Sequence, residues 1–84
     1  MISIEIIDLF NTSMGSIVLL ELQENVQLSA IIELIKNDKT IMLSALPFSR
    51  PTLEPKMGKK LLFYRLNNHT EKEWISIGDI WLIK

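Results

Sequence analysis

The sequence predicts a mostly β chain that forms a small six-stranded barrel, closed or partly open. Apolar and polar residues alternate over residues 2–6, and a period of two is typical of strands. Glycine supplies the positive-φ turns and bulges that short, bent strands require. Each of the three glycines borders an aliphatic run: Gly15, Gly58 and Gly78. All three prolines are confined to residues 47–55, in agreement with their exclusion from central strands.

Length and composition limit the classes of protein. The 84 residues suffice for one domain, 1–84, and are too few for two hydrophobic cores. Hydrophobic residues make up 48% of the chain, so a core can form without a metal or a disulfide. The absence of cysteine excludes disulfides, thiolate catalysis and cysteine-ligated zinc. The formal net charge of −1 offers no basic face to duplex DNA, which we do not expect as a partner.

The first two strands are separated by a short turn. We predict a strand over Met1–Phe10 with a bulge near Ile6-Ile7, because the apolar residues change parity there. Asn11–Gly15 has the composition of a turn, and a second strand is predicted over Ser16–Leu22. Apolar residues are consecutive over Ile17–Leu20, which predicts either burial on both faces of this strand or a strongly curved barrel strand.

The segment 26–35 fits two patterns. From Leu28 onward, apolar residues recur at i, i+3, i+4 and i+7, as in a helix, but from Val26 onward they also alternate, as in a strand. The polar turn Lys36–Lys39 contains an Asn-Asp pair that tolerates positive φ, and Thr40–Leu46 is rich in strand-forming residues. We therefore favour a hairpin and expect at most one short helix, near residues 26–35.

The prolines place residues 47–57 in a long loop. A strand over Leu61–Leu66, a polar loop over Asn67–Glu73 and a closing strand over Trp74–Ile83 are predicted to follow. A second bulge is expected in the closing strand at Gly78-Asp79.

The two tryptophans have opposite parity in the predicted closing strand. A regular strand cannot place Trp74 and Trp81 on one face, so we expect one to cap the barrel and the other to be exposed, unless the bulge changes the register. An exposed tryptophan would be a candidate anchor for a partner.

Five segments match, in order, short motifs of one β-barrel family: Ile4–Phe10, Gly15–Val18, Lys39–Ala45, Met57–Leu66 and Ile77–Trp81. Together they resemble the second domain of translational GTPases such as elongation factor Tu. Two positions depart from the family pattern, because Ser29-Ala30 replaces its Gly-Asp pair and Ser13-Met14 stands where its first turn carries a basic residue. The resemblance implies a barrel and an association with the translation machinery, and it transfers no activity.

Residues suited to catalysis or metal binding do not cluster in the sequence. His69 is the only histidine and lies in a polar stretch without a neighbouring nucleophile, and the carboxylates are scattered singly. Acid–base and metal sites need several such groups held together. We therefore expect no enzyme, no catalytic residue, no cofactor and no metal.

Partner-binding residues are predicted in the proline-containing loop and in the basic strand after it. Loops on rigid scaffolds often carry binding residues, and the basic side chains could steer an acidic partner. The six predicted residues are Phe48, Arg50, Leu53, Lys59, Lys60 and Arg65. Phe63 and Tyr64 are candidate stacking platforms for single-stranded RNA, a partner that the net charge disfavours.

The sequence thus predicts a small, non-enzymatic module that binds another protein. A bacterial immunity or inhibitor protein that neutralises a toxin or effector is one alternative, and an RNA- or ribosome-associated barrel is the other. No apolar stretch reaches the ~20 residues that span a bilayer, and the first ten residues lack the basic start and cleavage site of a secretory signal. We expect a cytoplasmic protein that does not act at a membrane.

Overall fold

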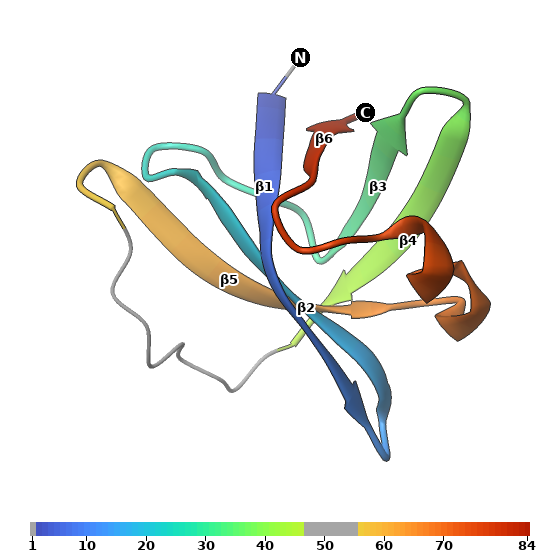
Figure 1. The fold of residues 1–84 in the computed structure, drawn as a ribbon. Helices are drawn as coiled ribbons and strands as arrows, with labels where there is room; N and C mark the ends of the chain where they lie inside the picture. Colours follow the sequence, from blue (N-terminus) through green and yellow to red (C-terminus); the bar gives the residue numbers. More distant parts are fainter. Residues whose placement is uncertain (1, 47–55) are drawn as a thin grey trace.

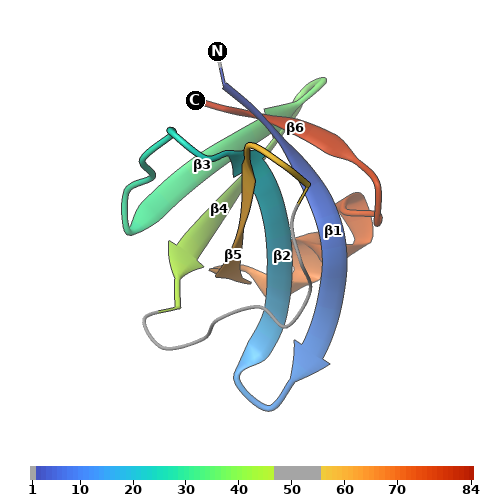
Figure 2. The ribbon, with the colours of Figure 1, turned by 90° about the vertical axis from the view of Figure 1, so that its left-hand side faces the viewer.

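Six antiparallel strands pair in a closed ring in the order β1-β2-β5-β4-β3-β6 (Figure 1). The computed structural model describes residues 2–46 and 56–84. Its elements are β1 (Ile2–Thr12), β2 (Gly15–Gln23), β3 (Ile31–Lys36), β4 (Lys39–Ala45), β5 (Lys59–Leu66), the 3-10 helix η1 (His69–Trp74) and β6 (Ile80–Ile83). The pairing of β1 with β6 closes the ring beside the two chain ends (Figure 2). The predicted six-stranded, mostly β barrel is confirmed.

The bulge predicted in the first strand is present in β1. The register shifts between Ile6 and Asp8, so Ile7 is the extra residue. Because of this shift, Ile6 and Leu9 both contact the core although they have opposite parity. Asp8 takes an outer-face position instead, opposite Leu19.

The hairpin favoured for the ambiguous segment is also confirmed. β3 and β4 pair from Ile31 opposite Ser44 to Lys36 opposite Lys39. Asn37 adopts the positive φ, 57°, that the turn requires. Residues 24–30, which lead into β3, contain no helix.

The one short helix among the described residues lies instead in the predicted polar loop. In η1, Asn68 is the N-cap, and its side-chain oxygen accepts hydrogen bonds from the backbone N–H and the hydroxyl of Thr70 at 3.2 and 2.7 Å. Asparagine at this position stabilises a helix start because it satisfies a free N–H group. The prediction of a loop over Asn67–Glu73 was therefore wrong for most of this segment, which forms η1.

The predicted closing strand was also too long. Trp74 ends η1, and β6 begins only at Ile80, so no bulge in a strand is formed at Gly78. Ser76 and Asp79 close a four-residue turn, in which the Asp79 N–H donates to the Ser76 carbonyl oxygen (3.1 Å) and the Ser76 N–H donates to Asp79 Oδ2 (2.9 Å). Gly78 has φ 94°, which suits the third position of a type II turn.

An ion pair ties this turn to the neighbouring hairpin. Lys36 Nζ lies 3.0 Å from Asp79 Oδ1. Partial burial by itself raises the pKa of the Asp79 carboxyl, but the hydrogen bond from the Ser76 backbone and the Lys36 ammonium outweigh it. The pKa of Asp79 is therefore lowered below its ordinary value, and the carboxylate form is favoured in the folded protein.

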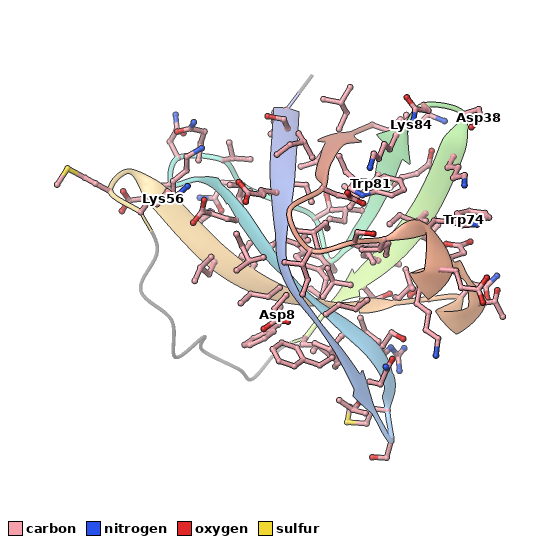
Figure 3. The ribbon with its side chains drawn as sticks, viewed as in Figure 1. Asp8, Asp38, Lys56, Trp74, Trp81 and Lys84 are labelled. Carbon is pink, nitrogen blue, oxygen red and sulfur yellow. The ribbon has the colours of Figure 1, made fainter. Side chains whose placement is uncertain are left out.

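The two tryptophans differ in exposure, as expected, but strand parity is not the reason, because Trp74 belongs to η1 (Figure 3). Trp81 is fully buried, and Trp74 is 40% exposed. The Nζ atom of Lys39 lies 5.2 Å from the centroid of the Trp74 ring, within range of a cation–π interaction.

The barrel interior is filled by one apolar core to which all six strands contribute. Its buried members are Ile4, Ile6, Val18, Leu20, Leu22, Ile32, Leu34, Ile41, Leu43, Tyr64, Leu66, Ile75 and Trp81. Partly buried Val26 and Leu28, from the connection before β3, pack against this core. The Tyr64 hydroxyl donates to the Ser29 carbonyl oxygen at 2.9 Å and so fixes the same connection.

Candidate functional site

Apolar side chains also occupy the outside of the barrel over β1, β2 and β5. Phe10 lies opposite Ile17, and Leu19 lies opposite Phe63. Side chains alternate between the faces of a strand, and none of these four residues belongs to the core cluster. Consecutive apolar residues in the second strand predicted burial on both faces or a strongly curved strand, and Leu19 is indeed 1% exposed.

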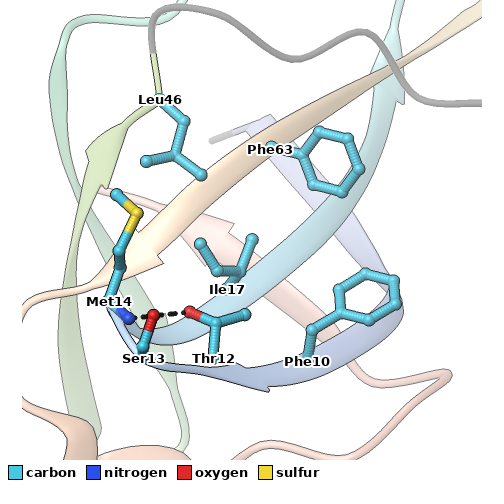
Figure 4. A pocket seen from close by; sticks show the side chains of 7 residues that line it. All are labelled: Phe10, Thr12, Ser13, Met14, Ile17, Leu46 and Phe63. Carbon is cyan, nitrogen blue, oxygen red and sulfur yellow. Dashed lines mark hydrogen bonds between the residues drawn. The ribbon is translucent and has the colours of Figure 1, made fainter.

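A groove of about 320 Å³ opens on this outer face (Figure 4). We call it the outer groove, and its lining residues are Phe10, Thr12, Ser13, Met14, Ile17, Leu46 and Phe63. The ring centroids of Phe10 and Phe63 lie 6.2 Å apart, with their planes tilted by 56°. Tilted pairs at this separation are favourable for aromatic rings. The lining is thus mostly apolar and contains an aromatic pair.

The turn between β1 and β2 holds one side of the groove. The Thr12 hydroxyl donates to the Gly15 carbonyl oxygen at 2.8 Å and accepts from the Met14 N–H at 3.1 Å. Gly15 has φ 108°, a conformation that other residues rarely adopt. These contacts fix the turn, while the Met14 side chain stays 52% exposed.

Three carboxylates continue the same outer face beyond the groove. We call them the acidic row: Glu5, Asp8 and Glu21. Asp8, labelled in Figure 3, lies opposite Leu19, two residues before Phe10. Glu5 lies opposite Glu21 in the next outer-face position. Negative charge therefore adjoins the apolar lining on the β1 side.

Of the six predicted partner-binding residues, three lie in the described part of the chain. Arg65 is exposed and lies opposite Ile17, next to the outer groove. Lys59 has the same parity as Arg65 but lies six residues away, about 20 Å along a strand, and Lys60 has the opposite parity. The structure therefore does not gather the three basic residues into one cluster. Phe48, Arg50 and Leu53 lie outside the described residues.

The two proposed stacking residues have different surroundings. Phe63 is half-buried in the outer groove. Tyr64 is only 3% exposed and faces the core, where burial raises the pKa of its hydroxyl. The prediction of Tyr64 as a stacking platform was therefore wrong, because alternation turns it inward.

A second hollow of about 350 Å³ lies over β3 and the chain ends. Exposed Ile31 and Met42 contribute to its lining. The ion pair between Lys84 Nζ and Glu33 Oε2, at 2.9 Å, crosses its border. Its lining is more polar than that of the outer groove, and it contains no aromatic residue.

Further comparisons add no assignment. Among the side chains that the structure describes in residues 2–46 and 56–84, no group of three could hold a metal ion. In the same part of the chain, no helix has the length and apolar character needed to cross a membrane. The chain has no significant match among protein-family models, curated proteins or solved structures.

Proposed function

We propose that this protein is a non-enzymatic module that binds another protein by holding an apolar side chain of that partner in the outer groove. The observation that carries the proposal is an open apolar lining outside a barrel whose interior core is already filled. Phe10 and Met14 remain 40% and 52% exposed there. Clustered apolar side chains exposed to water are typical of interaction sites.

A protein side chain suits the groove better than a small molecule. Small-molecule sites usually combine an apolar lining with several convergent polar groups that fix the ligand. Here the polar lining residues are Thr12 and Ser13, and the Thr12 hydroxyl already makes two hydrogen bonds within the turn. The volume of about 320 Å³ lies at the lower end for ligand pockets.

Arg65 is the predicted contact that lies nearest to the groove, and we retain it in the proposal. It is exposed beside Ile17, where arginine can pair with a carboxylate of the partner. RNA is a weaker candidate partner, because the acidic row on the same face would repel phosphates. Phe48, Arg50 and Leu53 remain predicted contacts that the described residues do not test.

The proposal can be tested by affinity capture with two matched methionine variants. Met14→Asp places a charge in the outer groove, whereas Met57→Asp places it at a fully exposed turn position outside the groove. Captured proteins would be quantified by mass spectrometry, and co-purified RNA would be measured in parallel. We expect wild type and Met57→Asp to recover the same protein, and Met14→Asp to recover at least tenfold less of it.

Equal recovery by all three forms would contradict the proposal. Recovery of RNA in place of a protein, equally sensitive to Met14→Asp, would instead support the RNA-associated alternative. The unfolding temperature of each variant should be measured first, so that loss of recovery is not caused by loss of fold.

A further inference from the structure

The acidic row has no cationic partner among the described residues. The two ion pairs there join Lys36 to Asp79 and Lys84 to Glu33, and neither involves a member of the row. Strand β2 separates Arg65 and Lys59, which lie towards opposite ends of β5, from the two β1 members of the row. Lys59 lies two positions from the β5 residue opposite Glu21, but no ion pair joins Lys59 to Glu21. The negative charge beside the groove is therefore not neutralised by an ion pair within this part of the protein.

Among the described residues alone, the arrangement within the row is unfavourable. Glu5 and Glu21 are direct cross-strand neighbours, and like charges in such a pair destabilise a sheet. Glu21 is only 7% exposed, which reduces its contact with water. Asp8 Oδ1 accepts the Leu9 N–H at 2.8 Å, and its second oxygen makes no hydrogen bond to a described residue. A cation placed over this face would relieve the repulsion.

We propose that the partner presents a basic segment, in which lysine or arginine side chains follow or precede the apolar side chain held in the outer groove. This inference rests on the proposed function and specifies its partner. Outer-face positions repeat about every 7 Å along a strand, so Asp8 lies one step from Phe10, and Glu5 lies further along. An extended partner segment would match them with basic residues two and four positions from its apolar residue.

A protein cation fits this surface better than the other charged ligands. Phosphate groups of RNA or of a membrane surface would meet the carboxylates and be repelled. The three side chains do not converge as metal ligands, since no group of that kind occurs among the described residues. Guanidinium and ammonium groups, in contrast, form charge-assisted hydrogen bonds with separate carboxylates.

The test uses a library of random 12-residue peptides displayed on phage, selected on the wild-type protein. Affinities of the selected peptides would be measured by fluorescence polarisation for wild type and for the double variant Glu5→Gln/Asp8→Asn. Both substitutions keep the shape of the side chain, and the amide oxygen introduced at position 8 can still accept the Leu9 N–H. Glu73→Gln is the control for the loss of one carboxylate outside the row, in η1.

We expect selected peptides to combine an aromatic or aliphatic residue with two lysines or arginines within four positions. Their affinity should fall about five- to tenfold in the double variant. It should change less than twofold in Glu73→Gln, and it should be lost in Met14→Asp.

Peptides that need Met14 but lack basic residues, or that bind the double variant as tightly as wild type, would overturn this inference and leave the proposed function intact. Peptides that bind Met14→Asp unchanged, or failure to select any peptide, would count against both. The two proposals therefore fail in different ways.

Discussion

The two faces of strand β2 are both apolar, but they differ in how they are covered. On the inner face, Val18 and Leu20 are fully buried by side chains from the other strands. On the outer face, Ile17 is only half-buried, and its neighbour Phe10 is 40% exposed. We call the apolar side chains that face the core the inner set, and those on the outside of β1, β2 and β5 the outer set. Closing the barrel requires only the inner set. Leu19 on the outer face is also covered, at 1% exposed, so the exposed parts of Ile17 and Phe10 are the apolar surface that we propose for a partner.

The largest effect is expected from breaking the inner set. Trp81 is fully buried, so Trp81→Ala should lower the free energy of unfolding by about 3–5 kcal/mol. Trp74→Ala serves as the control, because Trp74 is 40% exposed, and should cost about 1 kcal/mol or less. Urea unfolding of both variants measures the difference. Similar losses would show that the interior is not the main source of stability.

A smaller effect is expected in the turn that leads into β6. Gly78 has φ 94°, and an added Cβ would meet no atom within 4 Å, so the cost of Gly78→Ala comes from the backbone. We expect a loss of about 1–2 kcal/mol. Gly78→Asn should lose less, because asparagine tolerates positive φ better. Thermal unfolding of both variants checks the order, and an equal loss would contradict this explanation.

The ion pair at the same turn should make stability depend on pH. The pKa of Asp79 is lowered in the folded protein, whereas an unfolded aspartate has a pKa of about 3.9. The stabilisation of the fold by the Asp79 carboxylate is therefore complete above the unfolded-state pKa. This stabilisation is lost as the pH falls through the lower, folded-state pKa of Asp79. Asp79→Asn should therefore cost about 1 kcal/mol at pH 6 and progressively less below pH 4.

Unfolding temperatures measured from pH 6 to pH 2 check this prediction. Asp38→Asn, in the exposed β3–β4 turn, is the control for removing an aspartate that forms no ion pair with a described residue. A constant difference between wild type and Asp79→Asn over this range would contradict it.

The smallest change in stability is expected in the outer set. Phe10 is 40% exposed, and its ring forms a tilted pair with Phe63, so Phe10→Ala should lower the free energy of unfolding by about 1 kcal/mol or less. Partner binding should weaken by more than about 1 kcal/mol, as for a central interface residue. Calorimetric measurement of unfolding and of binding tests both. A large loss of stability with unchanged binding would assign Phe10 to the fold.

Local features of the fold could be predicted from the sequence, because each depends on few neighbours. The change of parity at Ile6-Ile7 predicted the bulge, and the Asn-Asp pair after Lys36 predicted the hairpin turn. The start of η1 was missed, although Asn68 offers a helix cap. The closing strand was overextended, because the hydrogen bond from the Ser76 N–H to Asp79 forms only once the turn exists.

The outer groove could not be assembled from the sequence in the same way. Its residues come from β1, the β1–β2 turn, β2, β5 and Leu46, the residue that follows β4. Only the pairing of these strands brings the residues together. Consecutive apolar residues in β2 did signal an apolar outer face. These residues of β2 did not show that Phe10 and Leu46 complete the outer groove.

The most direct test of the central claim is a methyl NMR titration of the protein with the partner recovered by capture. If the outer groove binds that partner, the methyl signals of Met14 and Ile17 should shift most, and those of the buried Leu34 and Ile41 should shift little. The largest shifts at Ile31 and Met42, in the second hollow, would place binding elsewhere and contradict the claim.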